Sequence, residues 1–396
     1  MPAFSNAAMR SFHPFFSNCA HKCKNTWDIL TKDNGAAIEI QTWMNKISID
    51  SIGQGGFSHD FRAFEGEQPI VAKMFDADDA STSFLNMLPT LLLFFPWLDK
   101  LPGQRKKQAR RLGESLKGIA DEVWARARKG EVSDGMGETS VMSRLMRAKG
   151  SESGLQLSRE EVLDEITVLV LAGYITTSTT LTWALVELAR NPDAQKKLRD
   201  ELAQYDGDQL SYDELMNNSI LPYLDAVTHE TLRLHPAATE VERAIQDDLI
   251  PLSSPVVSAS GAPISQVPVP RGTLVAVPIA AINRSPRFWG PDAASFRPER
   301  WLDGAAESGP AEELVGHRHL ITFANGPRTF LVDEEEKLMW CALQTVLSVL
   351  ARHFSFEIDG GNAQKVTILR GRSLPARMIL GENGKPVTLK VTRDPA

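Results

Sequence analysis

The stretch SREEVLDEITVLVLAGYITTSTTLTWALVELARNP, residues 158–192, decides the fold of this 396-residue chain. Ser158 followed by Glu161 is a capping box that starts a helix, and Asn191 with Pro192 is a stop signal. The spacing predicts a helix of about 33 residues, ~50 Å long. Because its middle is apolar on most faces, we expect this helix to run through the centre of a mainly α fold.

The segment AGYITTSTT, residues 172–180, interrupts the apolar character of this helix. Gly173 weakens a helix interior, and the hydroxyls that follow can bond the carbonyls of the preceding turn. A helix loosened in this way can hold a small ligand against its backbone. The alternative is a close helix–helix contact made by small residues.

Composition limits the classes of function. A net charge of -7 and a pI near 5.7 argue against general nucleic-acid binding. The three cysteines, Cys19, Cys23 and Cys341, imply no disulfide framework and fit a reducing compartment. Cys19 and Cys23 lack a second pair at metal-ligand spacing, so we expect a packed helix face there.

Residues 6–65 have apolar residues at helical spacing, and Gly53, Gly55 and Gly56 interrupt that pattern. The N-terminus lacks the layout of a signal peptide, and no segment reaches the ~20 apolar residues of a transmembrane helix. We therefore expect no membrane anchor in this chain. The apolar segment MLPTLLLFFPWL, residues 87–98, precedes several basic residues and leaves open a weak contact with a membrane surface.

Two further motifs carry charge. Glu230 and Arg233 in HETLRLHP are three residues apart on one helix face among leucines, which favours a partly buried ion pair. Arg300 lies in the proline-rich stretch FRPERW. The stretch FANGPRTFLVDEEEKLMW, residues 323–340, begins as a tight turn and then places Phe330 where a soft metal ligand would be expected.

In this order, these motifs resemble the cytochrome P450 family, most closely its fungal membrane-associated members, over almost the whole chain. AGYITTS is similar to the oxygen-binding groove of the family. Glu230, Arg233 and Arg300 are similar to its Glu-x-x-Arg motif and the arginine that completes the triad. FANGPRTFLV resembles the haem loop, Phe-x-x-Gly-x-Arg-x-Cys-x-Gly.

The resemblance implies one P450-like domain over residues 1–396, mainly α with a small β subdomain. It also implies haem as the cofactor, a small lipophilic substrate and electrons from an NADPH-P450 reductase. By the same resemblance Arg328 contacts a haem propionate, Thr176 helps to protonate bound dioxygen, and the Glu230 triad is structural. The location implied is the cytoplasm or the cytosolic face of the endoplasmic reticulum.

The sequence departs from the family at the residues that carry its chemistry. Phe330 replaces the thiolate ligand and has no lone pair to donate to iron. Val332 replaces a glycine that permits close backbone approach. The carboxylates of residues 333–336 would repel an acidic redox partner. Cys341 lies ~16 Å further along a helix and should not reach the iron.

Two other departures concern the oxygen groove and the start of the chain. Ile175 replaces the acid that precedes Thr176 and cannot relay a proton. The chain is expected to begin near the third major helix of the family, without the anchor, the first helices and the first strands.

Three interpretations follow. The first is a P450 homologue that is inactive as a haem-thiolate monooxygenase. The second is an active monooxygenase of a small lipophile, whose sequence around residues 330–339 reflects a misread exon boundary. The third is a protein that binds a small lipophile without redox chemistry.

Overall fold

The computed structural model describes ten main stretches of the chain. They are residues 6–66, 104–129, 158–205, 209–237, 240–244, 246–302, 309–323, 329–358, 366–380 without 371–374, and 385–394. The apolar segment of residues 87–98 and Arg328 lie outside the described residues.

Helix α7 spans Arg159–Arg190, 32 residues, which confirms the predicted long helix. The capping box is also confirmed. Ser158 Oγ accepts the Glu161 amide at 3.2 Å, and Glu161 Oε2 accepts the Ser158 amide at 2.8 Å. The helix ends before Pro192, which starts the next helix. Both ends of α7 are therefore set by local side-chain chemistry.

Helices make up most of the described structure. The longer ones are α1 (Asn6–Leu30), α2 (Ile40–Phe57), α5 (Gln104–Lys129), α7, α8 (Pro192–Leu202), α10 (Pro222–Leu234) and α13 (Thr329–His353). The short ones are η2 (Ala63–Glu65), α9 (Tyr212–Leu215), α11 (Ile279–Ile282), α12 (Pro286–Trp289), η7 (Pro298–Trp301), η8 (Pro310–Glu313) and η9 (His317–His319).

The strands form small antiparallel sheets, in the orders β1-β10-β6, β2-β5, β3-β4 and β7-β8-β9. Their bounds are β1 Ala36–Glu39, β2 Glu240–Arg243, β3 Asp248–Val257, β4 Pro263–Val269, β5 Leu274–Val277, β6 Phe354–Ile358, β7 Val366–Arg370, β8 Pro375–Leu380, β9 Lys385–Pro386 and β10 Thr388–Arg393. In the first sheet Ile38 pairs with Leu389, so a strand from the N-terminal part of the chain joins one from the C-terminal part. The expected class, mainly α with a small β portion, is confirmed.

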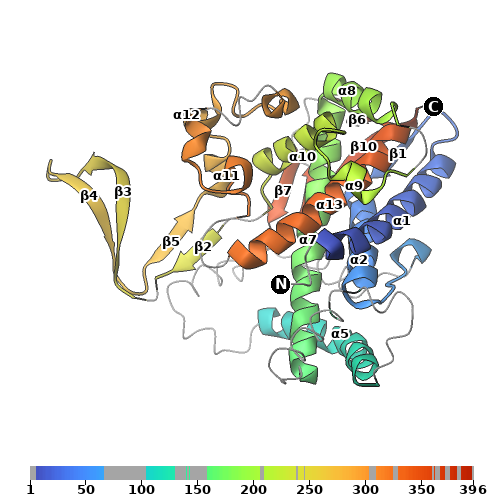
Figure 1. Cartoon of the computed structure of the whole chain (residues 1–396), viewed down its shortest axis with the longest axis horizontal. Helices are drawn as coiled ribbons and strands as arrows, with labels where there is room; N and C mark the ends of the chain where they lie inside the picture. The colour runs from blue at the N-terminus through green and yellow to red at the C-terminus, as the bar shows by residue number, and fades with distance from the viewer. Residues whose placement is uncertain are drawn as a thin grey trace.

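Helix α7 crosses the centre of the molecule, and α2, α5, α10 and α13 pack around it (Figure 1). The main core fills the space between its C-terminal half and α1, α10, α13 and the first sheet. Within the described residues, α7 is also the one helix long and apolar enough to cross a membrane. Since most of it is buried inside the protein, it is accounted for as a core helix.

The face of α1 that carries the two cysteines is buried, as predicted. Cys19 and Cys23 are both inaccessible and lie in the main core with Trp27. Within the described residues no cluster of three or more His, Cys, Asp or Glu side chains could hold a metal ion.

The expected interruption at the glycines of α2 is wrong, because the helix continues through them to Phe57. The glycines instead allow close contacts. A Cβ on Gly53 would lie 2.5 Å from the carbonyl oxygen of His59, and one on Gly55 would lie 2.5 Å from the Phe12 ring. Each would overlap an atom of a neighbouring segment. A helix pattern cannot reveal such contacts because the partner is remote or lies in a turn.

The two glycines Gly53 and Gly56 make a matched test of this explanation. We expect Gly53→Ala to destabilise the fold by about 1–3 kcal/mol, because the backbone oxygen of His59 must move. In Gly56→Ala the nearest atom, on Ile52, would be 3.9 Å away, so the variant should be neutral or gain about 0.5–1 kcal/mol of helix propensity. Urea denaturation followed by circular dichroism measures both. Equal stabilities for the two variants would contradict the close-contact explanation.

Candidate functional site

A buried carboxylate at the end of α10 holds two arginines. Glu230, Arg233 and Arg300 have 0%, 0% and 3% exposure. Glu230 accepts both Nε and Nη2 of Arg233, at 2.9 and 2.8 Å, and Nε of Arg300 at 3.0 Å. The structure thus brings together the three side chains that the sequence singled out. The predicted partly buried pair is a fully buried network.

The same carboxylate has two further donors that sequence reasoning missed. Glu230 accepts the indole N–H of Trp301 at 3.0 Å and the backbone amide of Arg297 at 2.9 Å. Five hydrogen bonds to one carboxylate offset much of the cost of removing its charge from water. Trp301 directly follows Arg300 in the sequence, which is the only local signal that could have suggested it.

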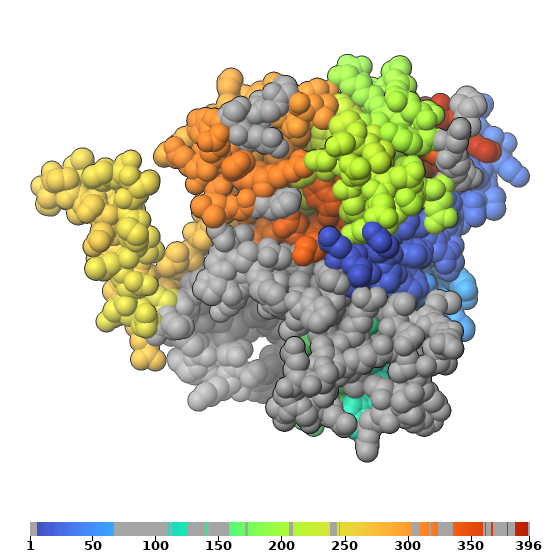
Figure 2. Space-filling view, in the orientation of Figure 1, coloured from blue at the N-terminus to red at the C-terminus, as the bar shows by residue number. Residues whose placement is uncertain are grey.

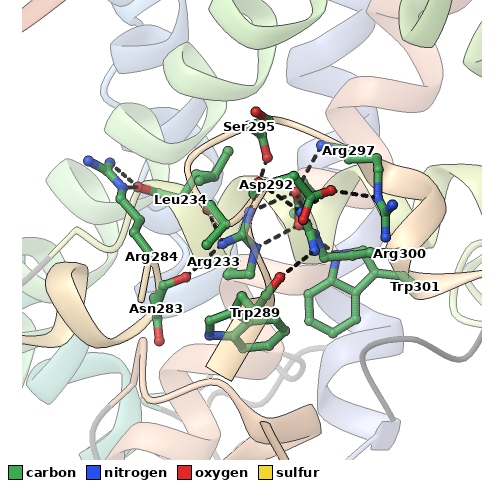
Figure 3. A network of polar contacts seen from close by, with 12 residues as sticks. Arg233, Leu234, Asn283, Arg284, Trp289, Asp292, Ser295, Arg297, Arg300 and Trp301 are labelled. Atoms are coloured by element: carbon green, nitrogen blue, oxygen red, sulfur yellow. Dashed lines mark hydrogen bonds and ion pairs between the residues drawn. The ribbon is translucent and has the colours of Figure 1, made fainter. Parts of the chain in front are cut away.

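The arginines use their remaining donors on backbone carbonyls. Arg233 donates to Asn283, Ala293 and Ser295, at 2.7, 2.6 and 3.2 Å (Figure 3). Arg300 donates to Trp289 and Asp292, each at 3.2 Å. All these carbonyls belong to the irregular segment of residues 283–295. The network therefore fixes the path of a segment that has little regular structure of its own.

A second chain of bonds connects this segment to the start of the loop that resembles the haem loop. The side-chain amide of Asn283 donates to Thr322 Oγ1 at 2.9 Å, and that hydroxyl donates to the carbonyl of Leu232 at 2.8 Å. Thr322 is 7% exposed and precedes Phe323, the first residue of the loop. The entry to the loop is therefore held by α10 and by the residues that Arg233 holds.

The predicted oxygen groove lies on α7, with Ile175 at 4% and Thr176 at 6% exposure. Thr180 Oγ1 donates to the carbonyl of Thr176 at 2.8 Å, and Ser178 Oγ donates to that of Ile175 at 3.2 Å. These hydroxyls bond the preceding turn as expected, yet the helix stays continuous. Ile175 packs in an apolar cluster with residues of α2 and α5.

Gly173 makes a close helix–helix contact, which was the alternative interpretation of this segment. A Cβ there would lie 2.6 Å from Ile52 of α2 and 3.6 Å from Leu338 of α13. Ser48 of α2 contributes a hydroxyl within 3.1 Å of the Gly173 carbonyl and 2.9 Å of the Tyr174 carbonyl. Sequence reasoning missed Ser48, because nothing local distinguishes it from a surface serine.

The ligand position of the haem loop belongs to a helix. Helix α13 begins at Thr329, so the backbone of both Phe330 and Val332 is helical. The resemblance to the family implies a helix that begins at the carboxylates of residues 333–336, so the start at Thr329 is earlier. The earlier start has a simple cause, since residues 329–340 contain neither glycine nor proline and acids near a helix N-terminus are favourable.

The residues present do not fit a thiolate-ligated haem iron. Phe330 has no donor atom, and the suggested propionate ligand Arg328 lies outside the described residues. Cys341 is on the same helix as Phe330, eleven residues and therefore ~16 Å further on. It is fully buried against Phe12 and Phe16 of α1, and burial raises the pKa of its thiol to about 12. It is a core residue and not a substitute ligand.

An open pocket of about 700 Å³ lies beside the first half of α13. Its described charged lining residues are the cations Arg10, Arg318 and Lys337 and the acids Asp213, Asp225 and Glu336. Arg10 pairs with Asp213, and Arg318 pairs with Asp225 at 2.9 Å. The described charges of this surface are therefore balanced.

Comparison with known proteins agrees with this architecture. The sequence model of the cytochrome P450 family matches residues 1–367. The chain is 43% identical to cytochrome P450 monooxygenases claP and claO of Ampulloclitocybe clavipes, over 99% of this chain and 74% of each relative. It is 32% identical to cytochrome P450 monooxygenase 91 of Postia placenta, over 99% of this chain and 75% of that protein. The chain belongs to the cytochrome P450 family.

Removing the shared carboxylate should destabilise the fold strongly. We expect Glu230→Gln to cost about 3–5 kcal/mol, because it leaves the buried Arg233 without its counter-charge and leaves Arg300 with only the more distant Asp292, at 3.4 Å. A matched control is Glu313→Gln, which breaks an exposed pair with Arg287 and should cost at most about 1 kcal/mol. Denaturant unfolding measures both. Similar losses in the two variants would contradict a dominant role for the buried network.

Proposed function

We propose that this chain is a cytochrome P450 homologue that does not act as a haem-thiolate monooxygenase. The observation that carries the proposal is Phe330 at the ligand position, in the first turn of α13. A phenyl ring has no lone pair for iron, and neither a rotamer change nor a shift in pKa can supply one. When bound in this family, haem with a cysteine thiolate supplies the electron donation that favours O–O cleavage.

The oxygen groove supports the same conclusion. Ile175 stands where the family has an acid, and its side chain is buried in an apolar cluster. It can neither donate nor accept a proton. Thr176 keeps the hydroxyl that would help to protonate dioxygen, but its partner in that proton path is absent. The charge network of Glu230, Arg233 and Arg300 is complete, and we assign it a structural role.

The balance of charges on the surface beside α13 supports the proposal that a reductase docks here only weakly. An acidic electron donor is recognised by an excess of positive charge. The described pocket instead balances three cations with three carboxylates, one of them Glu336 from the acidic run. We therefore propose that the family's reductase would bind this surface poorly.

We propose that residues 1–396 form one domain. The pairing of β1 with β10 and the packing of α1 on α13 join the N-terminal and C-terminal parts of the chain into one body. A small lipophilic molecule remains the expected ligand, because the family takes such substrates.

Active monooxygenation is the second candidate. It is favoured by 43% identity to curated monooxygenases over 99% of the chain, with the divergence at the haem loop confined to a short run. In that case the run at residues 330–339 would come from a misread exon boundary. Sequencing the transcript across residues 323–340 decides this, because a cysteine codon at position 330 would support the active form.

A carbon monoxide difference spectrum tests the proposal directly. We expect the purified chain, reconstituted with haem and reduced under carbon monoxide, to lack the Soret band of thiolate-ligated haem. If the native chain does show the Soret band of thiolate-ligated haem in this measurement, the proposal is overturned.

The double variant Phe330→Cys/Val332→Gly is the matched positive control, because it restores the donor and the glycine together. We expect it to gain the thiolate band if the surrounding residues still accept haem. The third interpretation, a protein that binds a small lipophile without redox chemistry, is tested by mass spectrometry of extracts from the native chain. A bound lipophile would support it.

A further inference from the structure

The open pocket beside the first half of α13 has the size of a small-molecule site. Its volume is about 700 Å³, within the ~300–1,000 Å³ of pockets that hold such ligands. Its described walls come from the start of α1, from α9 and the residues after it, from α10, and from the turn at η9. On the face shown in Figure 2, the start of α1, in dark blue, lies beside the yellow-green residues of α9 and α10. None of the described lining residues belongs to the Glu230 network or to the oxygen groove.

Two of the acids in this pocket are already neutralised. Arg10 pairs with Asp213. Asp225 accepts Nη1 of Arg318 at 2.9 Å, and Nδ1 of His229 lies 3.4 Å from the same oxygen. Burial alone would raise the pKa of Asp225, but the bonds from His229 and Arg318 hold it below its usual value. These acids therefore offer little further attraction to a cation and little repulsion to an anion.

Lys337 is the cation of the pocket that lacks a partner among the described residues. It is exposed on α13 and forms no ion pair with any residue that the structure describes. The acid next to it in the sequence is Glu336, which also lines the pocket. An exposed ammonium at the edge of a hollow can bind an anionic group that the hollow admits.

An aromatic wall lies next to this ammonium. Trp340 and Lys337 are three residues apart on α13 and so share a helix face. The Trp340 ring is half-buried, and its centroid lies 4.0 Å from that of His229, which is 1% exposed. The buried imidazole holds one side of the indole, and the indole also lines the pocket. A flat ring stacked on Trp340 would therefore place an attached charged group near Lys337.

A strained turn supplies a second cation to the pocket. Arg318 and His319 are consecutive residues with left-handed backbone, at φ values of 47° and 64°. Residues other than glycine seldom adopt this conformation, and strain of this kind clusters at ligand clamps. The bond to Asp225 uses Nη1 of Arg318, and a guanidinium has further N–H donors suited to a carboxylate.

We infer that this pocket binds a small aromatic carboxylate. The ring stacks on Trp340, the carboxylate contacts the Lys337 ammonium, and the guanidinium of Arg318 adds attraction from the opposite wall. A cationic ligand would meet Lys337 together with acids that are already bonded to Arg10 and Arg318. A neutral ring would gain only the stacking. The site involves neither the haem question nor the proposed loss of monooxygenation, so either proposal can fail without the other.

Isothermal titration calorimetry of the full chain with 2-naphthoate tests the inference. We expect a Kd of ~0.1–1 mM, in the range for a ligand of about a dozen heavy atoms in an open site. Three matched probes separate the contributions. The neutral 2-naphthamide, the cationic 2-naphthylmethylamine and the non-aromatic cyclohexanecarboxylate should each bind at least ~3-fold more weakly, because each lacks the charge or the ring.

Substitutions on α13 test the contact with the carboxylate. Lys337→Gln should weaken binding of 2-naphthoate by ~5–10-fold, because it removes the ammonium. Glu336→Gln should strengthen binding by ~2–5-fold, because it removes a negative charge beside the ligand. The matched control is Lys32→Gln, which changes an exposed lysine outside the pocket and should leave the Kd unchanged. Circular dichroism should show all the variants folded.

The inference is overturned if 2-naphthoate does not bind, or if it binds native and Lys337→Gln protein equally. Equal affinity for 2-naphthamide overturns it too, because the pocket would then not recognise charge.

Fluorine NMR of the chain labelled with 5-fluorotryptophan locates the ligand. The Trp340 resonance is identified by its loss in Trp340→Leu, and 2-naphthoate should shift it in the otherwise native chain. If calorimetry detects binding while this resonance stays in place, the ligand binds elsewhere and the inference fails.

Discussion

The buried carboxylate of Glu230 is the interaction on which the rest of this structure depends. It accepts hydrogen bonds from two arginines, an indole and a backbone amide, and it has no exposed surface. The arginines then donate to the carbonyls of a segment that has little regular structure besides the short helix α12. Without the carboxylate, the buried Arg233 would have no counter-charge and Arg300 would keep only Asp292, at 3.4 Å, so the support of the segment would weaken.

The network serves the fold and does not depend on the chemistry of the family. Each of these hydrogen bonds joins one part of the scaffold to another, and none requires a cofactor. Helix α13 also has two parts, one that belongs to the core and one that carries the ligand position. Its C-terminal half, with Leu343, Val346 and Leu350, is buried in the main core. Its first turn carries the position that matches the iron ligand of the family, Phe330.

The features that the sequence predicted correctly are those set by residues close together in the chain. The capping box, the stop at Pro192 and the length of α7 all followed from residues within the helix itself. The Glu230 triad was identified by its motif, but its depth and its extra donor Trp301 depend on distant backbone. The same limit explains the error in α2, where Gly53 and Gly55 make room for His59 and Phe12. Ser48 and Thr322 gave no signal, because each acts on a carbonyl far away in the sequence.

The motifs of this chain therefore differ in what they indicate: some indicate only the fold, and others bear on function. Gly173 is required by the contact with Ile52, and Glu230, Arg233 and Arg300 are required by the path of residues 283–301. Their presence indicates the fold, whether or not the protein oxidises anything. The position of Phe330 differs, because in the family the residue there donates a lone pair to iron. A phenyl ring has no lone pair to donate, so Phe330 argues against a thiolate-bound iron.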